Sequence, residues 1–124
     1  APMIVVDTDV LIEMFDKKSE RGLSAYKKLE QSGEDMAITA VSYHELTYGL
    51  LRFGKKRIPS IEKLEVIPYT KDDALLSAKL EQEYEGHGIS RSDAMIAAIT
   101  LNMKARIYTF NQRHFQAIPQ LQLF

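Results

Sequence analysis

The stretch IVVDTDVLIEMF, residues 4–15, decides how the rest of the chain is read. Its first residues are uniformly apolar and mostly β-branched, which is typical of a short strand buried on both faces of a sheet. Apolar residues at helical spacing follow, so a short helix over residues 7–16 is expected directly after the strand. Asp7 and Asp9 lie where the strand gives way to the helix. Carboxylates at such a junction either cap the helix or provide a place for a positive charge.

The composition is that of an ordinary globular protein. The chain has 124 residues, 45% apolar and 27% charged, which is enough to bury a core without disulfides or a structural metal. One domain is expected over residues 3–124, and Ala1-Pro2 is read as a cloning remnant outside the fold. The absence of cysteine excludes a disulfide framework, cysteine-based zinc sites and cysteine nucleophiles.

Charge and hydropathy restrict the partners. The formal net charge is −1, whereas a domain that binds nucleic acid through a broad basic face is usually clearly positive. Contact with nucleic acid must therefore be local, bridged by metal or assembled by oligomerisation, and the densest basic stretch is RFGKKR, residues 52–57. No apolar run approaches the ~18 residues that suggest a membrane span, and no signal-like segment precedes Met3. No membrane contact and a cytoplasmic location are expected.

Strands alternate with helices along the chain. Further strands are expected over residues 36–39, 64–68, 106–110 and 121–124, and further helices over residues 20–32, 42–54, 70–88 and 92–105. Leu23, Tyr26 and Leu29 form the expected inward face of the first of these helices, and Ser42 is the expected N-cap of the second. The alternation predicts an α/β fold, a three-layer α/β/α sandwich around a mostly parallel sheet. The ligand site of such a sheet lies at the carboxyl ends of strands, where Asp7 is expected.

Four positions place a polar side chain at an expected strand end or helix start. They are Asp7 with its neighbour Asp9, Glu45 in VSYHELTYG, Asp93 in ISRSDAMIAA, and Asn111 in YTFNQRHF. Each also has a purely structural interpretation. Asp7 and Asp93 suit helix caps, Glu45 suits a solvent-facing helix position, and Asn111 suits a turn.

The chemistry of the combination favours a metal site. If Asp7, Glu45 and Asp93 reach one edge of the sheet, three like charges share a small volume and raise one another's pKa values. A basic side chain or a divalent cation would relieve the repulsion, and oxygen-only ligands select Mg²⁺ or Mn²⁺ over zinc. Because Mg²⁺ commonly recruits substrate phosphates, such a site suits the cleavage of phosphodiesters.

Taken together, the motifs resemble a known family. VVDTDVLIEMF, AVSYHELTYGLLR, ISRSDAMIAAITL and IYTFNQRHF, in this order, resemble the PIN-domain ribonucleases and, more narrowly, the VapC-like toxins of toxin–antitoxin pairs. The resemblance extends from Met3 to Phe124. It implies a five-stranded parallel sheet between helices, dependence on Mg²⁺ or Mn²⁺, a homodimer and cleavage of single-stranded RNA. It also implies a cognate antitoxin that threads a peptide, often with an arginine, into the acidic site.

The resemblance also assigns the central residues of the site. It implies that Asp7, Glu45 and Asp93 are the metal ligands. The fourth acidic position of the family falls on Asn111, two residues after Thr109. Asn111 keeps a carbonyl oxygen but lacks the charge, so it is expected in the catalytic set as a ligand through water or as a group that orients the nucleophile.

A second set of residues is expected to support this site. Thr8, Asp9 and Thr109 are expected to position or cap the ligands rather than bind the metal themselves. Arg91 and Arg113 lie close in sequence to the site residues. Each is expected either to contact a phosphate of the RNA or to form a salt bridge with a site carboxylate.

The sequence leaves two other functions open. A catalytically degenerate PIN-like domain that only binds a partner is favoured by Asn111. The D-x-D spacing of DTDVL is similar to that of aspartate-nucleophile phosphatases, with Asp7 as nucleophile and Asp9 as acid and base. That motif needs Thr or Val where Leu11 stands, and the acidic pair in KDDALL opens a helix instead of following a strand. A phospho-acceptor receiver domain needs a central Asp, and residues 50–60 contain none.

Overall fold

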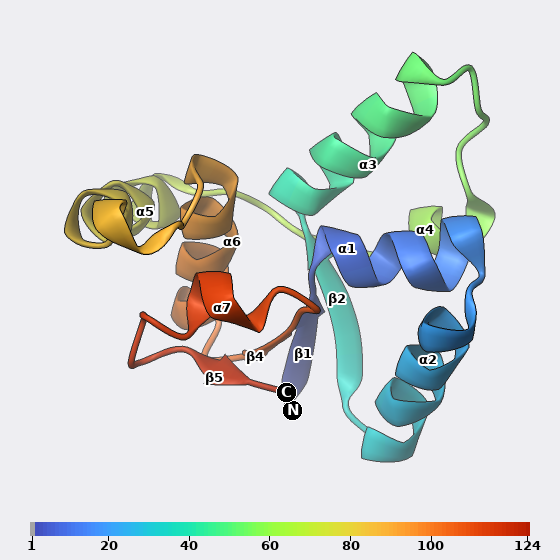
Figure 1. The fold of residues 1–124 in the computed structure, drawn as a ribbon, viewed down its shortest axis with the longest axis horizontal. Helices are drawn as coiled ribbons and strands as arrows, with labels where there is room; N and C mark the ends of the chain where they lie inside the picture. The colour runs from blue at the N-terminus through green and yellow to red at the C-terminus, as the bar shows by residue number, and fades with distance from the viewer. Residues whose placement is uncertain (1) are drawn as a thin grey trace.

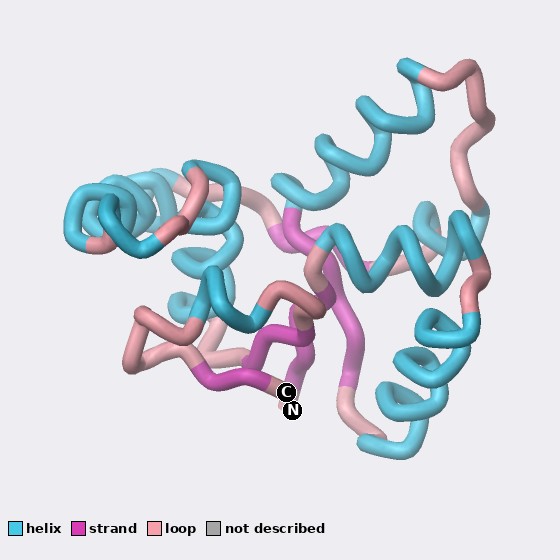
Figure 2. Tube along the Cα trace, in the orientation of Figure 1, coloured by secondary structure: helices cyan, strands magenta, loops and turns pink. Residues whose placement is uncertain are grey.

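The computed structural model describes residues 2–124 and contains one sheet of five parallel strands (Figures 1 and 2). The strands are β1 (Met3–Val6), β2 (Asp35–Thr39), β3 (Glu65–Ile67), β4 (Arg106–Tyr108) and β5 (Gln122–Leu123). Their order across the sheet is β3-β2-β1-β4-β5, and each neighbouring pair is parallel. The strands β2 and β3 extend the sheet on one side of β1, and β4 and β5 extend it on the other. The switch point in strand order therefore lies between β1 and β4.

Helices cover both faces of the sheet, as Figure 1 shows. The helical segments are α1 (Thr8–Leu11), the π-helical η1 (Ile12–Lys17), α2 (Glu20–Ser32), α3 (Ala40–Arg52), α4 (Pro59–Glu62), α5 (Lys71–Glu83), the 3₁₀ turn η2 (Glu85–His87), α6 (Arg91–Asn102) and α7 (Gln112–Phe115). The segments α1 to α4 pack on one face and α5 to α7 on the other. The predicted three-layer α/β/α sandwich is therefore confirmed. No helix within residues 2–124 has both the length and the apolar character needed to cross a membrane.

The position of β1 explains its apolar sequence. Ile4 and Val6 belong to the core cluster formed with α1, α2 and α3, whereas Val5 belongs to the cluster formed with α5, α6 and α7. All three side chains are fully buried. Because helices cover both faces of the sheet, every residue of the strand meets a core, and no polar alternation remains in its sequence.

Several details of the sequence prediction are wrong. The helix expected over residues 70–88 ends at Glu83, the helix expected over residues 92–105 ends at Asn102, and the strand expected over residues 106–110 ends at Tyr108. The short helices α4 and α7 are absent from the sequence prediction.

The helix α3 begins at Ala40 rather than Ser42, because the hydroxyl of Thr39 is the N-cap and accepts a hydrogen bond from the Ser42 amide. The helix α2 has the predicted bounds, but Leu23 is 61% exposed and Tyr26 is 39% exposed. The buried face of α2 is lined in part by small residues, which allow the helix to lie close to η1.

The π-helical segment η1 has no signal in the sequence pattern. It buries Glu13, which accepts hydrogen bonds from the Ser19 hydroxyl at 2.9 Å and from Arg21 at 3.2 Å and forms a salt bridge with Lys17 at 3.3 Å. The bonds from Ser19, Arg21 and Lys17 hold the pKa of Glu13 below its ordinary value, although burial opposes them. The segment ends at Lys18, whose φ of 52° lies in the left-handed region. Glu13 is therefore a structural carboxylate of the turn between α1 and α2.

Candidate active site

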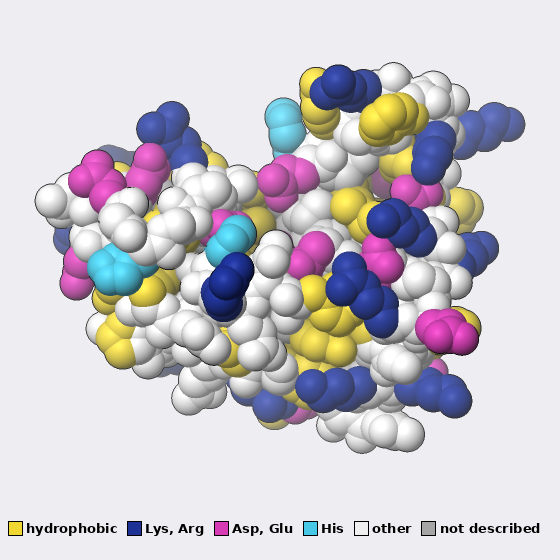
Figure 3. All heavy atoms as spheres, in the orientation of Figure 1, with side chains coloured by type: hydrophobic (Ala, Val, Ile, Leu, Met, Phe, Trp, Pro, Cys, Tyr) yellow, Lys and Arg dark blue, Asp and Glu magenta, His cyan; other side chains and the backbone are white. Residues whose placement is uncertain are grey.

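The predicted acidic residues meet at the carboxyl edge of the sheet, around the end of β1. Asp7 directly follows β1, and its amide donates to the Tyr108 carbonyl of β4 at 2.9 Å, so these two strand ends are held together. Glu45 lies in α3, which begins where β2 ends, and Asp93 lies in the first turn of α6. Figure 3 shows acidic side chains in the middle of the molecular face that it presents, with Lys and Arg side chains beside them. Three separate segments of the chain therefore supply the acidic groups.

Asp7 is buried and fixed by two hydrogen bonds. Its side chain is 6% exposed. The Oδ1 atom accepts from the Thr8 amide at 2.8 Å, which makes Asp7 the N-cap of α1, and the Oδ2 atom accepts from the Thr109 hydroxyl at 2.8 Å. The hydroxyl oxygen of Thr109 in turn accepts from the Asn111 amide at 3.0 Å. The cap interpretation of Asp7 is therefore confirmed, and the Thr109 bond from the segment after β4 sets the direction of its carboxylate.

The hydroxyl of Thr8 connects α1 to α3. It lies 2.7 Å from Oε1 of Glu45 and 3.0 Å from Oγ of Ser42 and can donate to either. Because Thr8 directly follows Asp7, its contact with Glu45 directs the Glu45 carboxylate toward the end of β1. The Thr8 hydroxyl therefore contacts the carboxylate of Glu45, which is half-exposed.

Asp93 joins a helix cap to a histidine that the sequence analysis does not assign. Its Oδ2 atom accepts from the Ser90 amide at 3.1 Å, which completes a capping box at the start of α6, and lies 3.0 Å from Nδ1 of His114. Both contacts fall on the same oxygen, and within residues 2–124 the Oδ1 atom has no hydrogen-bond partner. One oxygen of Asp93 therefore remains available to a ligand. His114 lies 21 positions away in sequence, and only the tertiary fold reveals this contact.

Burial and mutual repulsion shift the acidic pKa values in this region. Burial, followed by the charge of Asp9 and more weakly that of Asp93, raises the pKa of Asp7 to about 7, against the hydrogen bonds from Thr109 and Thr8. Burial also raises the pKa of Asp9, although the Phe110 amide and the charge of Arg21 oppose it. Asp7, Asp9 and Asp93 therefore act on one another electrostatically.

The acidic groups fit a hydrated cation better than a closed metal cage. Within residues 2–124, no three Asp, Glu, His or Cys side chains lie close enough together to hold one metal ion between them. Mg²⁺ usually keeps several waters and takes one or two carboxylates from the protein. Across the same described residues, neither Asp7 nor Glu45 forms a salt bridge with a basic side chain. The crowded carboxylate of Asp7, held only by neutral donors, fits such an ion.

The remaining predicted residues surround this centre with different partners. Asp9 accepts from the Phe110 amide at 3.2 Å and ties α1 to the segment after β4. Asn111 is exposed, and its side chain does not cap α7. Arg91 pairs with Glu81 of α5 at 3.1 Å instead of with a site carboxylate. Arg113 is exposed on α7 and forms no salt bridge with any residue of the 2–124 range.

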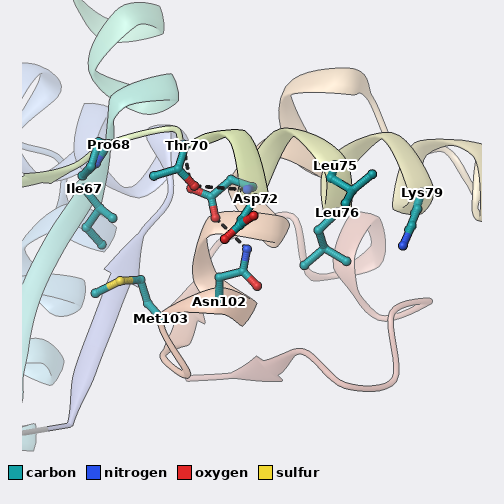
Figure 4. Close-up of a pocket in the computed structure, with 10 residues that line it drawn as sticks. Ile67, Pro68, Thr70, Asp72, Leu75, Leu76, Lys79, Asn102 and Met103 are labelled. Atoms are coloured by element: carbon teal, nitrogen blue, oxygen red, sulfur yellow. Dashed lines mark hydrogen bonds between the residues drawn. The ribbon is translucent and has the colours of Figure 1, made fainter.

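A separate cavity of about 560 Å³ lies between the start of α5 and the end of α6 and contains none of the predicted site residues (Figure 4). The buried Asp73 beside it accepts from the Thr70 amide at 2.9 Å and from the Asn102 side chain at 2.7 Å. Its carboxylate therefore caps α5 and ties this helix to α6. Asp73 of the acidic pair in KDDALL therefore has a structural role, which weakens the phosphatase interpretation.

The raised pKa of Asp7 gives a first prediction. The folded protein without metal holds the Asp7 proton more tightly than the unfolded chain, whose pKa is near 3.8. The resulting stabilisation is complete below that value and is lost as the pH rises through about 7. It amounts to at most roughly 4 kcal/mol.

Thermal denaturation at different pH values tests this prediction. Mg²⁺ should raise the melting temperature more at pH 8 than at pH 5, because the ion replaces the proton on Asp7. In the Asp7→Asn variant the difference between the two pH values should shrink. A rise that is equal at both pH values in the natural protein would contradict the prediction.

The protein is an α/β protein with an acidic centre at the carboxyl edge of a parallel sheet, near the switch point in strand order. The chain belongs to the PIN domain family, whose model matches residues 4–121. This assignment agrees with the resemblance found in the four motifs.

Individual relatives are similar over nearly the whole chain. Ribonuclease VapC2 of Rickettsia felis is 26% identical over 129 aligned positions, which cover 96% of this chain and 94% of the relative. A chain of a toxin–antitoxin complex from Klebsiella pneumoniae is 25% identical, with a TM-score of 0.77 and coverage of 95% of this chain and 94% of that one. A chain of VapBC2 from Rickettsia felis, bound to a DNA fragment from their promoter, has a TM-score of 0.77 at 22% identity and covers 98% and 97% of the two chains. The last likeness shows the fold alone.

Proposed function

We propose that this protein is a metal-dependent endoribonuclease that cleaves single-stranded RNA, and that it is the toxin of a toxin–antitoxin pair. The observation that carries the proposal is the buried Asp7 carboxylate, crowded by Asp9 and Asp93 at the carboxyl edge of the sheet and held only by neutral donors. Membership of the PIN domain family and the similarity to Ribonuclease VapC2 support the same activity.

Asp7, Glu45 and Asp93 would share one hydrated Mg²⁺ or Mn²⁺ ion, with one or two of the carboxylates bound to it directly and the rest through its water ligands. When bound, the ion lowers the pKa of a water ligand and neutralises charge on the leaving oxygen. Thr109 keeps the Asp7 carboxylate in place, and Thr8 does the same for Glu45. Asn111 is exposed, and its side-chain amide oxygen is available to orient a water beside this centre.

The proposed partners follow from the charge of the site. An arginine of an antitoxin peptide could occupy the space among the carboxylates, since a guanidinium pairs well with several acidic oxygens at once. Similarity to a chain of the Klebsiella pneumoniae toxin–antitoxin complex supports an antitoxin as partner. A homodimer is also part of the proposal, as the resemblance to VapC-like toxins implies.

Removal of the metal tests the proposed function. Purified protein is incubated with a defined single-stranded RNA and Mn²⁺, with EDTA, or with EDTA followed by excess Mn²⁺. Cleavage should stop in EDTA and return with excess Mn²⁺, because the acidic oxygens alone cannot activate water. Cleavage that continues in EDTA would rule out the metal mechanism, and gel electrophoresis of the labelled RNA measures all three reactions.

A second candidate function is a degenerate PIN-like domain that binds a partner without cleaving RNA. Asn111 favours it, because the amide stands where the family has a fourth acidic residue. The two candidates differ in one measurement. A degenerate domain would leave a broad set of RNAs intact in Mn²⁺ while Mn²⁺ still raised its melting temperature.

A further inference from the structure

A polar pocket opens beside the acidic site, between α2 and α7. Its volume is about 630 Å³, and Lys28, residues 108–113 and Gln116 line it. Thr109, in its wall, is the residue that donates to Asp7. This α2–α7 pocket therefore adjoins the proposed centre of cleavage.

The α2–α7 pocket carries positive charge next to an acidic centre. Lys28 and Arg113 are exposed, and neither forms a salt bridge with any of the described residues 2–124. The ammonium of Lys28 lies 5.0 Å from the ring centre of Tyr108 and 4.6 Å from that of Phe124. These cation–π contacts hold the ammonium at the pocket while its three N–H donors remain free for an anion.

The same pocket has a surface suited to a base. Phe110 is half-buried in its wall, and the guanidinium of Arg21 lies 4.5 Å from the centre of its ring. Proteins hold unstacked RNA bases against aromatic rings and guanidinium planes and read their edges with polar groups. The side chains of Asn111, Gln112 and Gln116 provide amide donors and acceptors along the pocket.

The opposite side of the acidic site is different. There a pocket of about 560 Å³ lies between α3 and α6 and includes Glu45, Val41, Tyr69 and Met95. Its one basic lining residue besides histidine, Arg91, is already paired with Glu81 at 3.1 Å. A phosphodiester chain is therefore better accommodated by the α2–α7 pocket than by this apolar one.

We propose that the α2–α7 pocket binds the nucleotide next to the cleaved bond of a single-stranded RNA. Lys28 and Arg113 contact phosphates of the RNA, and the base lies against Phe110 in the pocket wall. This inference rests on the proposed function for the position of the cleaved bond, whereas RNA binding in the pocket is measurable without cleavage.

Charge reversal tests the phosphate contacts. Binding of a short fluorescein-labelled single-stranded RNA is followed by fluorescence anisotropy in EDTA over a series of salt concentrations. Lys28→Glu and Arg113→Glu should each weaken binding by about 5-fold or more and lower the salt slope by ~0.7 for each phosphate that the variant no longer neutralises. Lys27→Glu, an equal change of charge at the exposed neighbouring position, should change binding less than about 2-fold.

One further variant and a cross-link complete the test. Lys28→Arg should bind like the natural protein, because it keeps the charge and the cation–π contacts. Melting curves identify any variant that is unfolded. Irradiation of RNA containing a photoreactive uridine should label the peptide with Tyr108 and Phe110 rather than the one with Tyr69.

The proposal is overturned by any of three results. These are equal effects of Lys28→Glu, Arg113→Glu and Lys27→Glu, a cross-link at Tyr69 instead of Phe110, or no RNA binding by the natural protein. Failure of the proposed function alone gives a different pattern, in which RNA binds in the pocket and is not cleaved in Mn²⁺.

Discussion

Asp7→Asn should reduce RNA cleavage by more than about 100-fold, since even residues that only support metal ligands contribute 10- to 100-fold. The substitution keeps the size of the side chain and an acceptor for the Thr8 amide. It removes the negative charge that is crowded by Asp9 and Asp93. The loss of activity should therefore come without a loss of folding.

Stability measurements separate these two effects. Without metal at pH 8, Asp7→Asn should melt at the same temperature as the natural protein or higher, because the variant no longer ionises a buried group. Asp35→Asn is the matched control, since Asp35 is exposed at the opposite end of a neighbouring strand. If Asp7→Asn and Asp35→Asn cleave RNA equally well, Asp7 is not a metal ligand.

Gly22→Ala should destabilise the protein by about 3 kcal/mol or more, the upper end of the usual cost of overpacking. A Cβ atom on Gly22 would lie 2.0 Å from the carbonyl oxygen of Glu13 and 2.8 Å from the amide nitrogen of Met14. Both are backbone atoms of η1 and cannot rotate away. The helix α2 would have to move away from η1, opening the contact that buries its small residues.

A second glycine provides the control for this prediction. Gly49 lies in α3, and no atom lies within 4 Å of the position of an added Cβ. Gly49→Ala should therefore stabilise the protein by roughly 0.5–1 kcal/mol through helix propensity. Urea denaturation measures both variants, and a Gly22→Ala protein as stable as Gly49→Ala would contradict the packing described for α2 and η1.

Much of the fold follows from local sequence signals, because strand and helix periodicities are local properties. The buried strand β1, the bounds of α2 and the caps at Thr70 and Ser90 agree with their sequence patterns. The errors arise where tertiary contacts determine the boundary of a helix or strand. Thr39 and Ser42 are both residue types that cap helices, and the place where β2 leaves the sheet selects Thr39.

For the candidate site too, local patterns indicate the residues, whereas tertiary contacts determine how their side chains are oriented. The acidic residue types and their positions at a strand end or near a helix start indicate Asp7, Glu45 and Asp93, and the fold brings them to one edge of the sheet. The orientation of their carboxylates depends on partners distant in sequence, such as Thr109 and His114. No local pattern encodes these pairings, so the sequence alone could not predict which oxygen atoms remain free.

The hydrogen bond from Thr109 to Asp7 joins residues that are 102 positions apart. A growing polypeptide that has not yet emerged as far as β4 lacks Thr109, and it also lacks the His114 partner of Asp93. Asp7 is synthesised 102 positions before Thr109, so its carboxylate lacks this support until the segment after β4 has been made. Under the proposed function, a nascent chain that stops before β4 is therefore an incomplete nuclease.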